Sequence, residues 1–87
     1  MIAGSIFVTP HAVEQFRARI APGLDYDRAL GAIVRELSEH AVSVRPSIVG
    51  HSIVVRTRGG RYTFRAVVVG DQDGRAPAVV TILRSGH

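Results

Sequence analysis

A Gly-Gly pair at positions 59 and 60 separates two stretches rich in β-branched residues, and it restricts the possible folds more than any other local feature. The flanking residues 52–58 and 61–69 have the composition of strands. A two-residue connection between antiparallel strands needs positive φ at its central positions, which glycine adopts at little cost. We therefore predict a tight β-hairpin with Gly59 and Gly60 at its tip.

This tip fixes the strand register and sorts the side chains onto two faces. Arg58 then faces Arg61, and Arg56 faces Thr63. One face carries residues suited to a core: Ile53, Val55, Thr57, Tyr62, Phe64, Ala66 and Val68. The other face carries a polar and basic set: Val54, Arg56, Arg58, Arg61, Thr63 and Arg65. The arginine quartet is defined as Arg56, Arg58, Arg61 and Arg65.

Like charges directly across a strand pair lower stability by roughly a few tenths of a kcal/mol to 1 kcal/mol, so the arginine quartet needs a compensating interaction. Two interpretations are open. The arginines either extend into solvent or pair with Asp71 and Asp73 in the following loop. Alternatively, they form a platform for a phosphate backbone, whose binding relieves the repulsion and releases counterions.

The first helix is expected over residues 10–21. Thr9 suits the N-cap position, and Pro10 suits the first helical position because its φ is already helical and no N–H is needed there. The apolar residues at helical spacing, which should face the core, are Val13, Phe16 and Ile20.

The second helix is expected over residues 25–41. Asp25 suits the N-cap, and Asp27 complements the positive end of the helix dipole. The predicted buried stripe consists of Tyr26, Leu30, Ile33, Val34, Leu37 and Ala41. The residues expected on the solvent side are Arg28, Arg35, Glu36, Ser38 and Glu39.

The remaining segments predict strands. Residues 42–48 alternate apolar and polar side chains until Pro46, which is typical of an edge strand, and residues 78–84 form a last strand. Ile6 to Thr9 is an extended lead into the first helix. The predicted class is therefore α+β, with two N-terminal helices packed on one face of a three- to four-stranded antiparallel sheet.

Length and composition limit the possible functions. With 87 residues, the chain fits a single domain over residues 1–87. It contains no cysteine, which excludes disulfides, thiolate nucleophiles and zinc sites built on sulfur. It also has no histidine pair at ligand spacing, so we expect no metal and no cofactor. Neither a signal peptide nor an apolar run of about 18 residues is found, so we expect a cytoplasmic location and no membrane partner.

The charge is basic and unevenly distributed. All eleven basic residues are arginine, and the formal net charge is +4. Residues 1–44 carry a net charge of −1 and residues 45–87 one of +5. A coding bias can explain arginine in place of lysine, but not five arginines and no acid within residues 45–70. This distribution favours an anionic partner such as nucleic acid.

His11, Gln15 and Arg19 are spaced by four residues and form a polar ridge along the first predicted helix. A neutral histidine can act as a general base, and nearby arginines can stabilise a pentavalent phosphate, which together suffice for RNA cleavage without a metal. The alternative is a structural histidine that donates a hydrogen bond to a backbone carbonyl.

Two segments resemble a known family: Thr9-Pro10-His11-Ala12-Val13-Glu14-Gln15-Phe16-Arg17-Ala18-Arg19 and Val79-Val80-Thr81-Ile82-Leu83. They are similar to the small bacterial and prophage domains related to the BrnT and RelE toxins. The resemblance implies a fold of the barnase and RelE kind, metal-independent RNA cleavage and a partner antitoxin. The matching positions are His11, Arg17, Arg19 and Thr81, whereas many relatives have arginine at the position of Gln15.

The primary hypothesis is therefore an RNA-directed ribonuclease. Its candidate catalytic residues are His11, Arg19, Tyr62 and Thr81, and its candidate nucleic-acid contacts are Arg17, Arg56, Arg58, Arg61 and Arg65. The alternative is a non-catalytic phage or prophage protein that binds nucleic acid or an acidic host protein. A third possibility is a homo-oligomer that buries Val54, Val67 and Val69 against a second copy.

Overall fold

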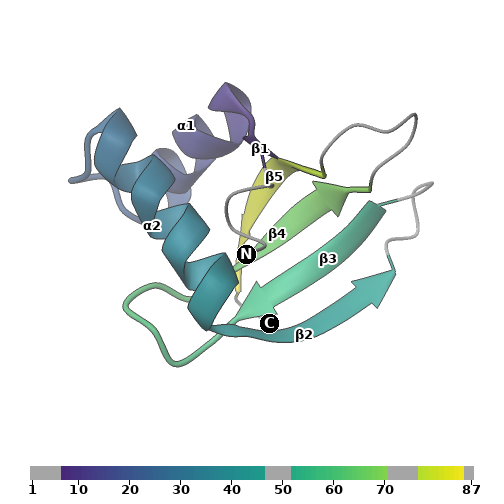
Figure 1. Ribbon diagram of the computed structural model, residues 1–87. Coiled ribbons are helices and arrows are strands. Elements are labelled where there is room, and N and C mark those ends of the chain that lie inside the picture. The colour runs from purple at the N-terminus through teal and green to yellow at the C-terminus, as the bar shows by residue number, and fades with distance from the viewer. Residues whose placement is uncertain (1–6, 47–51, 71–76, 86–87) are drawn as a thin grey trace.

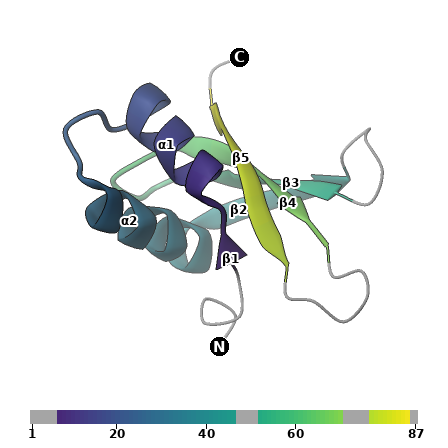
Figure 2. The ribbon, with the colours of Figure 1, turned by 90° about the horizontal axis from the view of Figure 1, so that it is seen from above.

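The computed structural model describes residues 7–46, 52–70 and 77–85. The class is α+β, as predicted. The elements follow one another in this order: β1 (Phe7–Val8), α1 (Pro10–Arg19), α2 (Tyr26–Glu39), β2 (Ala41–Pro46), β3 (Ser52–Thr57), β4 (Phe64–Val69) and β5 (Ala78–Arg84). Both helices lie on the same face of the sheet, and the opposite face has no described helix over it (Figure 1, Figure 2).

The sheet has five strands in the order β1-β5-β4-β3-β2. The antiparallel β2–β5 arrangement agrees with the predicted strands, but β1 pairs with β5 in parallel and makes the sheet mixed. The N–H of Phe7 donates to Pro77 O and that of Thr9 donates to Val79 O, each at 3.0 Å. A two-residue strand whose partner lies about 70 positions away leaves no periodic signal, which is why only an extended lead was expected.

Helix α1 begins as predicted. The Thr9 side chain accepts a hydrogen bond from the N–H of Ala12 at 3.2 Å, and Pro10 occupies the first helical turn. Val13 and Phe16 are fully buried. This helix contacts β5 and α2, so its apolar face supplies the middle of the core.

Helix α2 also begins at its predicted cap, because Asp25 Oδ1 accepts from the N–H of Arg28 at 2.8 Å. Its buried side differs from the prediction: the fully or nearly fully buried residues are Ala29, Ala32, Ile33 and Glu36. Of the predicted stripe, Ile33 is buried as expected, whereas Tyr26, Leu30, Val34 and Leu37 are only half-buried. Ala41 was predicted in the same stripe but is exposed and begins β2. Small alanine side chains allow the helix to approach its neighbours closely, so the alanine side packs inward.

The connection between β3 and β4 is longer than predicted. Strand β3 ends at Thr57 and β4 begins at Phe64, which leaves residues 58–63 outside the ladder. Arg56 pairs with Arg65 instead of Thr63, and Val55 pairs with Ala66 instead of Phe64. The predicted two-residue tip is therefore wrong, and the register differs by two positions.

The assignment of side chains to the two faces of the sheet is still correct. Side chains alternate with a period of two, so a register shift of two positions leaves each one on the same face. The buried set on these strands is Val55, Thr57, Phe64, Ala66 and Val68, all on the predicted core face. Ile53, predicted on that face, is 37% exposed.

Buried polar side chains explain the longer connection. Thr57 Oγ1 accepts from the N–H of Phe64 at 3.1 Å and so replaces a backbone rung of the hairpin. Glu36 Oε2 accepts from the N–H groups of Arg61 at 3.1 Å and Tyr62 at 3.4 Å. The side chain of Glu36 is 0% exposed, contrary to its predicted solvent position. Residues 58–63 are therefore bound to the end of α2 instead of closing as a tight turn.

Candidate nucleic-acid interface

No described helix covers one face of the sheet (Figure 2). Directly opposed residues of an antiparallel pair project to the same side, so the ladder partners assign this face. It consists of Ser43, Arg45, Val54, Arg56, Arg65, Val67, Thr81 and Leu83, and we call it the open face. The helices occupy the other side, which we call the helix side.

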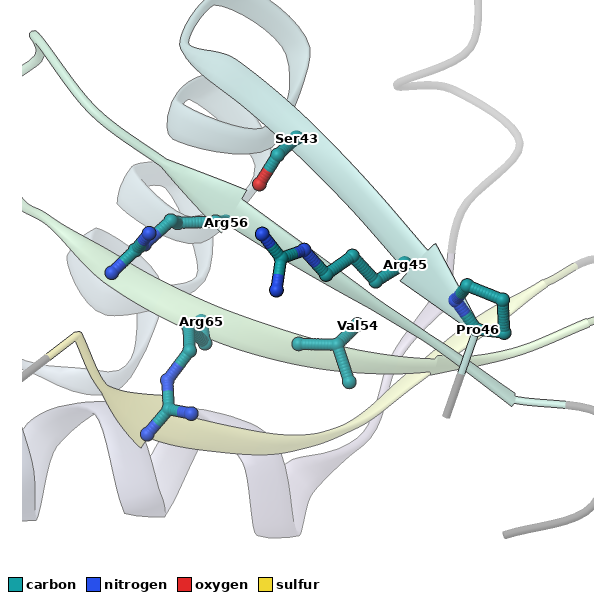
Figure 3. A pocket seen from close by; sticks show the side chains of 6 residues that line it. All are labelled: Ser43, Arg45, Pro46, Val54, Arg56 and Arg65. Carbon is teal, nitrogen blue, oxygen red and sulfur yellow. The ribbon is translucent and has the colours of Figure 1, made fainter. Parts of the chain in front are cut away.

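Three arginines from three adjacent strands meet on the open face: Arg45 on β2, Arg56 on β3 and Arg65 on β4. We call them the arginine trio. Arg56 and Arg65 are direct partners across the ladder, and Arg45 pairs with Val54, one side-chain position along from Arg56. Figure 3 shows the three side chains on the same side of the sheet, with Arg45 extending from β2 toward Arg56.

Two adjoining hollows follow the arginine trio. The first has a volume of about 270 Å³ and is lined by Ser43, Arg45, Pro46, Val54, Arg56 and Arg65 (Figure 3). The second has a volume of about 570 Å³ and adds Arg58 together with the hydroxyl side chains of Thr63 and Ser85. Because both hollows share Ser43, Arg45 and Arg56, they form one continuous basic surface.

The described carboxylates lie away from this surface. Glu14 is on α1, and Asp25, Asp27, Glu36 and Glu39 cap or belong to α2. Over residues 7–46, 52–70 and 77–85, no ion pair includes a member of the arginine trio or Arg58. Arg65 is oriented by a hydrogen bond from its Nε to Arg84 O at 3.0 Å. Asp71 and Asp73, the alternative partners considered from the sequence, lie outside the described residues.

The structure divides the predicted arginine quartet. Arg56 and Arg65 lie side by side on the open face, and Arg58 lines the adjoining hollow. Arg61 instead lines a hollow on the helix side together with Arg28 and Arg35. The prediction that all four arginines share one face depended on a tight turn. The observed connection has six residues, and this is why Arg61 lies on the other side from Arg56 and Arg65.

Arg45 belongs to the surface but was not among the candidate residues. Its strand alternates Val42 and Val44 with Ser43 and Arg45, so the period-two pattern already placed Arg45 on the polar side. The sequence did not predict that this strand pairs with β3, and this pairing brings Arg45 beside Arg56.

The candidate catalytic residues are not brought together. His11 is exposed in the first turn of α1, and Tyr62 packs edge-on against Phe16 with ring centroids 5.4 Å apart. Both belong to the helix side. Thr81 pairs with Val67 and lies on the open face. The sheet therefore separates Thr81 and the arginine trio from His11 and Tyr62.

Arg19 and Gln15 have a structural role that the sequence did not predict. Gln15 Oε1 accepts from the N–H of Ile82 at 2.8 Å, and Arg19 Nη1 donates to the carbonyl of the same residue at 2.8 Å. Strand β1 pairs only with Ala78 and Val79, so the two side chains occupy the edge of β5 beyond the end of β1. The polar ridge of α1 thus attaches the helix to the sheet.

Arg17, a candidate nucleic-acid contact, is also committed within the fold. Its Nε donates to Leu24 O at 2.9 Å, and its Nη1 pairs with Glu14 at 3.1 Å. These contacts hold the connection between α1 and α2, on the helix side, so Arg17 does not join the arginine trio.

Replacing Gln15 with Ala should lower the free energy of unfolding by about 1–2 kcal/mol, because the partly buried N–H of Ile82 loses its acceptor. Chemical denaturation measures this change. His11→Ala on the same helix is the matched control: His11 is exposed, and we expect a change within about 0.5 kcal/mol. Equal stability of the two variants would contradict the proposed attachment of α1 to β5.

The described part of the chain shows neither a metal-binding cluster nor a membrane-spanning helix. Over those residues, no three histidine, cysteine or acidic side chains gather as a metal site requires. Neither of the described helices combines the length and apolar character needed to cross a membrane.

Comparison with known proteins gives one partial similarity. The chain is 40% identical over 63 residues to kynurenine 3-monooxygenase from Salinispora arenicola (strain CNS-205). The match covers 72% of this chain but only 12% of that protein. No family model matches the chain, and no solved structure matches it. The likeness to the BrnT and RelE domains therefore stays an expectation based on the α1 and β5 segments.

Proposed function

We propose that this chain binds RNA through its phosphate backbone on the open face of the sheet. The observation that carries the proposal is the arginine trio on three neighbouring strands, with Arg58 beside it and no described carboxylate to neutralise it. RNA is the substrate class that the resemblance of α1 to the toxin-related domains implies. The partial similarity to a monooxygenase covers too little of that protein to assign a reaction to this chain.

Phosphate is the partner that best suits these side chains. Guanidinium groups bind phosphate oxygens through two parallel hydrogen bonds, and each contact releases condensed counterions. Arg56 and Arg65 face each other across the ladder, an arrangement that costs stability until an anion lies between them. The hydroxyl groups of Ser43, Thr63 and Ser85 line the same hollows and can donate to phosphate or ribose oxygens.

We expect the protein to contact the sugar-phosphate backbone of RNA and not to stack aromatic side chains on its bases. The chain has five aromatic residues, and none lies on the open face. Phe16, Tyr62 and Phe64 pack together on the helix side, and Phe7 and Tyr26 line a groove between β1 and α2. Without an aromatic platform, affinity should depend strongly on salt and weakly on base sequence.

The geometry favours a protein that binds RNA but does not cleave it with the candidate catalytic residues. A general base must come within hydrogen-bond reach of the proton that it removes. His11 is on α1, Arg19 is bound to the backbone of β5, and Tyr62 packs against Phe16, all on the opposite side of the sheet from the arginine trio. A strand of RNA on the open face therefore does not reach these groups.

The test is titration of a short labelled single-stranded RNA with the protein by fluorescence anisotropy, in EDTA and at several salt concentrations. We expect log affinity to fall linearly with log salt concentration, with a slope of about −0.7 for each phosphate contact. The double variant Arg56→Gln, Arg65→Gln should weaken binding at least about tenfold and reduce the slope by about 1.4.

Arg17→Gln and Arg28→Gln together form the matched control, because they remove the same charge from the helix side. The proposal fails if this control weakens binding as much as the open-face variant does, since net charge alone would then explain the affinity. Gel analysis of the same samples detects cleavage. RNA cut in EDTA by the wild type but not by His11→Ala would favour the ribonuclease hypothesis instead.

A further inference from the structure

A separate hollow lies on the helix side, on the opposite side of the sheet from the arginine trio. It has a volume of about 320 Å³ and lies between α2, the residues before it and the 58–63 connection. Three arginines from two segments line it: Arg28, Arg35 and Arg61. We call it the helix-side pocket. Its volume is at the lower end of the range for small-molecule sites.

The fold brings these three arginines together in two ways. Arg28 and Arg35 are seven residues apart, which corresponds to two turns on one side of α2 and a separation of about 10 Å along the helix. Arg61 is held opposite them, because its backbone N–H donates to the buried Glu36 Oε2 at 3.1 Å. The anchored backbone fixes where the Arg61 side chain begins.

The positive charge of the pocket is only partly neutralised. The Arg28 guanidinium and the Asp25 carboxylate are 4.0 Å apart and both largely exposed, so their pairing contributes little. Arg35 Nη2 contacts Glu36 Oε2 at 3.3 Å. Among the residues that the structure describes, the Arg61 guanidinium has neither a hydrogen bond nor an ion pair. The site therefore retains an excess of positive charge.

The rest of the pocket is apolar. The ring of Tyr62 forms one wall and is held in place by its edge-on contact with Phe16, at an interplanar angle of 80°. Leu24, partly buried against the core, forms another wall. Gly31 lies between Arg28 and Arg35 on α2, and a Cβ atom added there would meet no atom within 4 Å. A glycine inside a helix lowers helix stability, and here it leaves the floor of the pocket open.

We propose that the helix-side pocket binds a small anion with a planar ring, of the nucleoside monophosphate class. The three guanidinium groups suit the phosphate, and Tyr62 and Leu24 suit the face of the base. This site is independent of RNA binding on the open face, because the two surfaces share no residue.

Adenosine monophosphate is the probe, followed by amide chemical shifts in a ¹⁵N-labelled protein. Saturable shifts should occur at residues 28–35 and 61–62 and not at residues 43–45, 54–56 or 65. Adenosine and inorganic phosphate, tested separately, should each bind at least about tenfold more weakly than the nucleotide, because each supplies only one of the two contacts. Shifts confined to the open face, or no saturation at millimolar nucleotide, would overturn the proposal.

Two variants test the assignment by different means. Arg61→Gln removes one guanidinium, and Gly31→Leu fills the floor of the pocket where space is open. Each should weaken nucleotide binding at least about tenfold while RNA affinity on the open face stays unchanged. Arg58→Gln, in the same connection but lining the open-face hollow, is the matched control and should leave nucleotide affinity unchanged. Equal nucleotide affinity in wild type and both pocket variants would contradict the site even if RNA binding is confirmed.

Discussion

Gly60→Val should lower the free energy of unfolding by about 2–4 kcal/mol. A Cβ atom at Gly60 would collide with the Glu36 carboxylate and would lie 2.6 Å from His40 Cδ2. Glu36 is fully buried and accepts the N–H groups of Arg61 and Tyr62, so moving its carboxylate leaves both amides without their acceptor. Denaturation in urea measures the change, and thermal unfolding should shift by about 4–8 °C per kcal/mol for a domain of this size.

The neighbouring glycines provide matched controls. Gly59 has φ of +90° but free space around it, so Gly59→Ala should cost only about 1 kcal/mol from backbone strain. Gly31→Ala lies within α2 with space around it, so the better helix former should increase stability by roughly 0.5–1 kcal/mol. If Gly60→Val is no worse than Gly59→Ala, the packing of the 58–63 connection on Glu36 is wrong.

Phe16→Ala should destabilise the protein by about 3–5 kcal/mol. Phe16 is 0% exposed and packs edge-on against both Tyr62 and Phe64, with centroid distances of 5.4 and 5.3 Å. Removing it creates a cavity among α1, the 58–63 connection and β4. A chain of this size has little stability in reserve, so calorimetry of this variant should show a much lower or lost unfolding transition.

Phe7→Ala is the control for this experiment because Phe7 is 57% exposed, although it is the same residue type. We expect a loss below about 1 kcal/mol, since little apolar surface returns to water. A similar loss for Phe7→Ala and Phe16→Ala would mean that the core is not centred on the aromatic cluster of Phe16, Tyr62 and Phe64.

Local sequence signals were sufficient to predict where an element begins or ends when that boundary is set by residues within or next to the element. Thr9 and Asp25 cap α1 and α2 as predicted, because a cap needs only a side-chain oxygen next to the first free N–H groups. Strand β5 matches its predicted range of residues 78–84. The number of strands could not be predicted, because β1 exists only through its pairing with β5.

The hairpin register depended on contacts that are distant in sequence. The Gly-Gly pair favours a tight turn, but Glu36, 25 positions away, binds the amide of Arg61 and opens the turn. No pattern in α2 distinguishes a buried glutamate from a solvated one. Tertiary contacts therefore overrode a strong local preference.

The part of the candidate site that could be predicted is the side of the sheet on which each strand residue lies. Arg56 and Arg65 were placed on the surface opposite the core, and the error of two positions in register left them there. Arg61 was misplaced because it lies outside the strands, and Arg45 was overlooked because its strand pairing is not encoded locally. The likeness of α1 to toxin-related domains marked Arg19, whose guanidinium is bound to the backbone of Ile82.

The two edges of the sheet differ in their capacity to recruit another strand. At β5, the backbone groups of Val79 and Ile82 are already bound by Thr9, Gln15 and Arg19. The far side of β2 has no strand beside it among the described residues. Because side chains of α1 already occupy the stretch of β5 beyond β1, we expect strand pairing between two copies to occur at β2 and not at this part of β5.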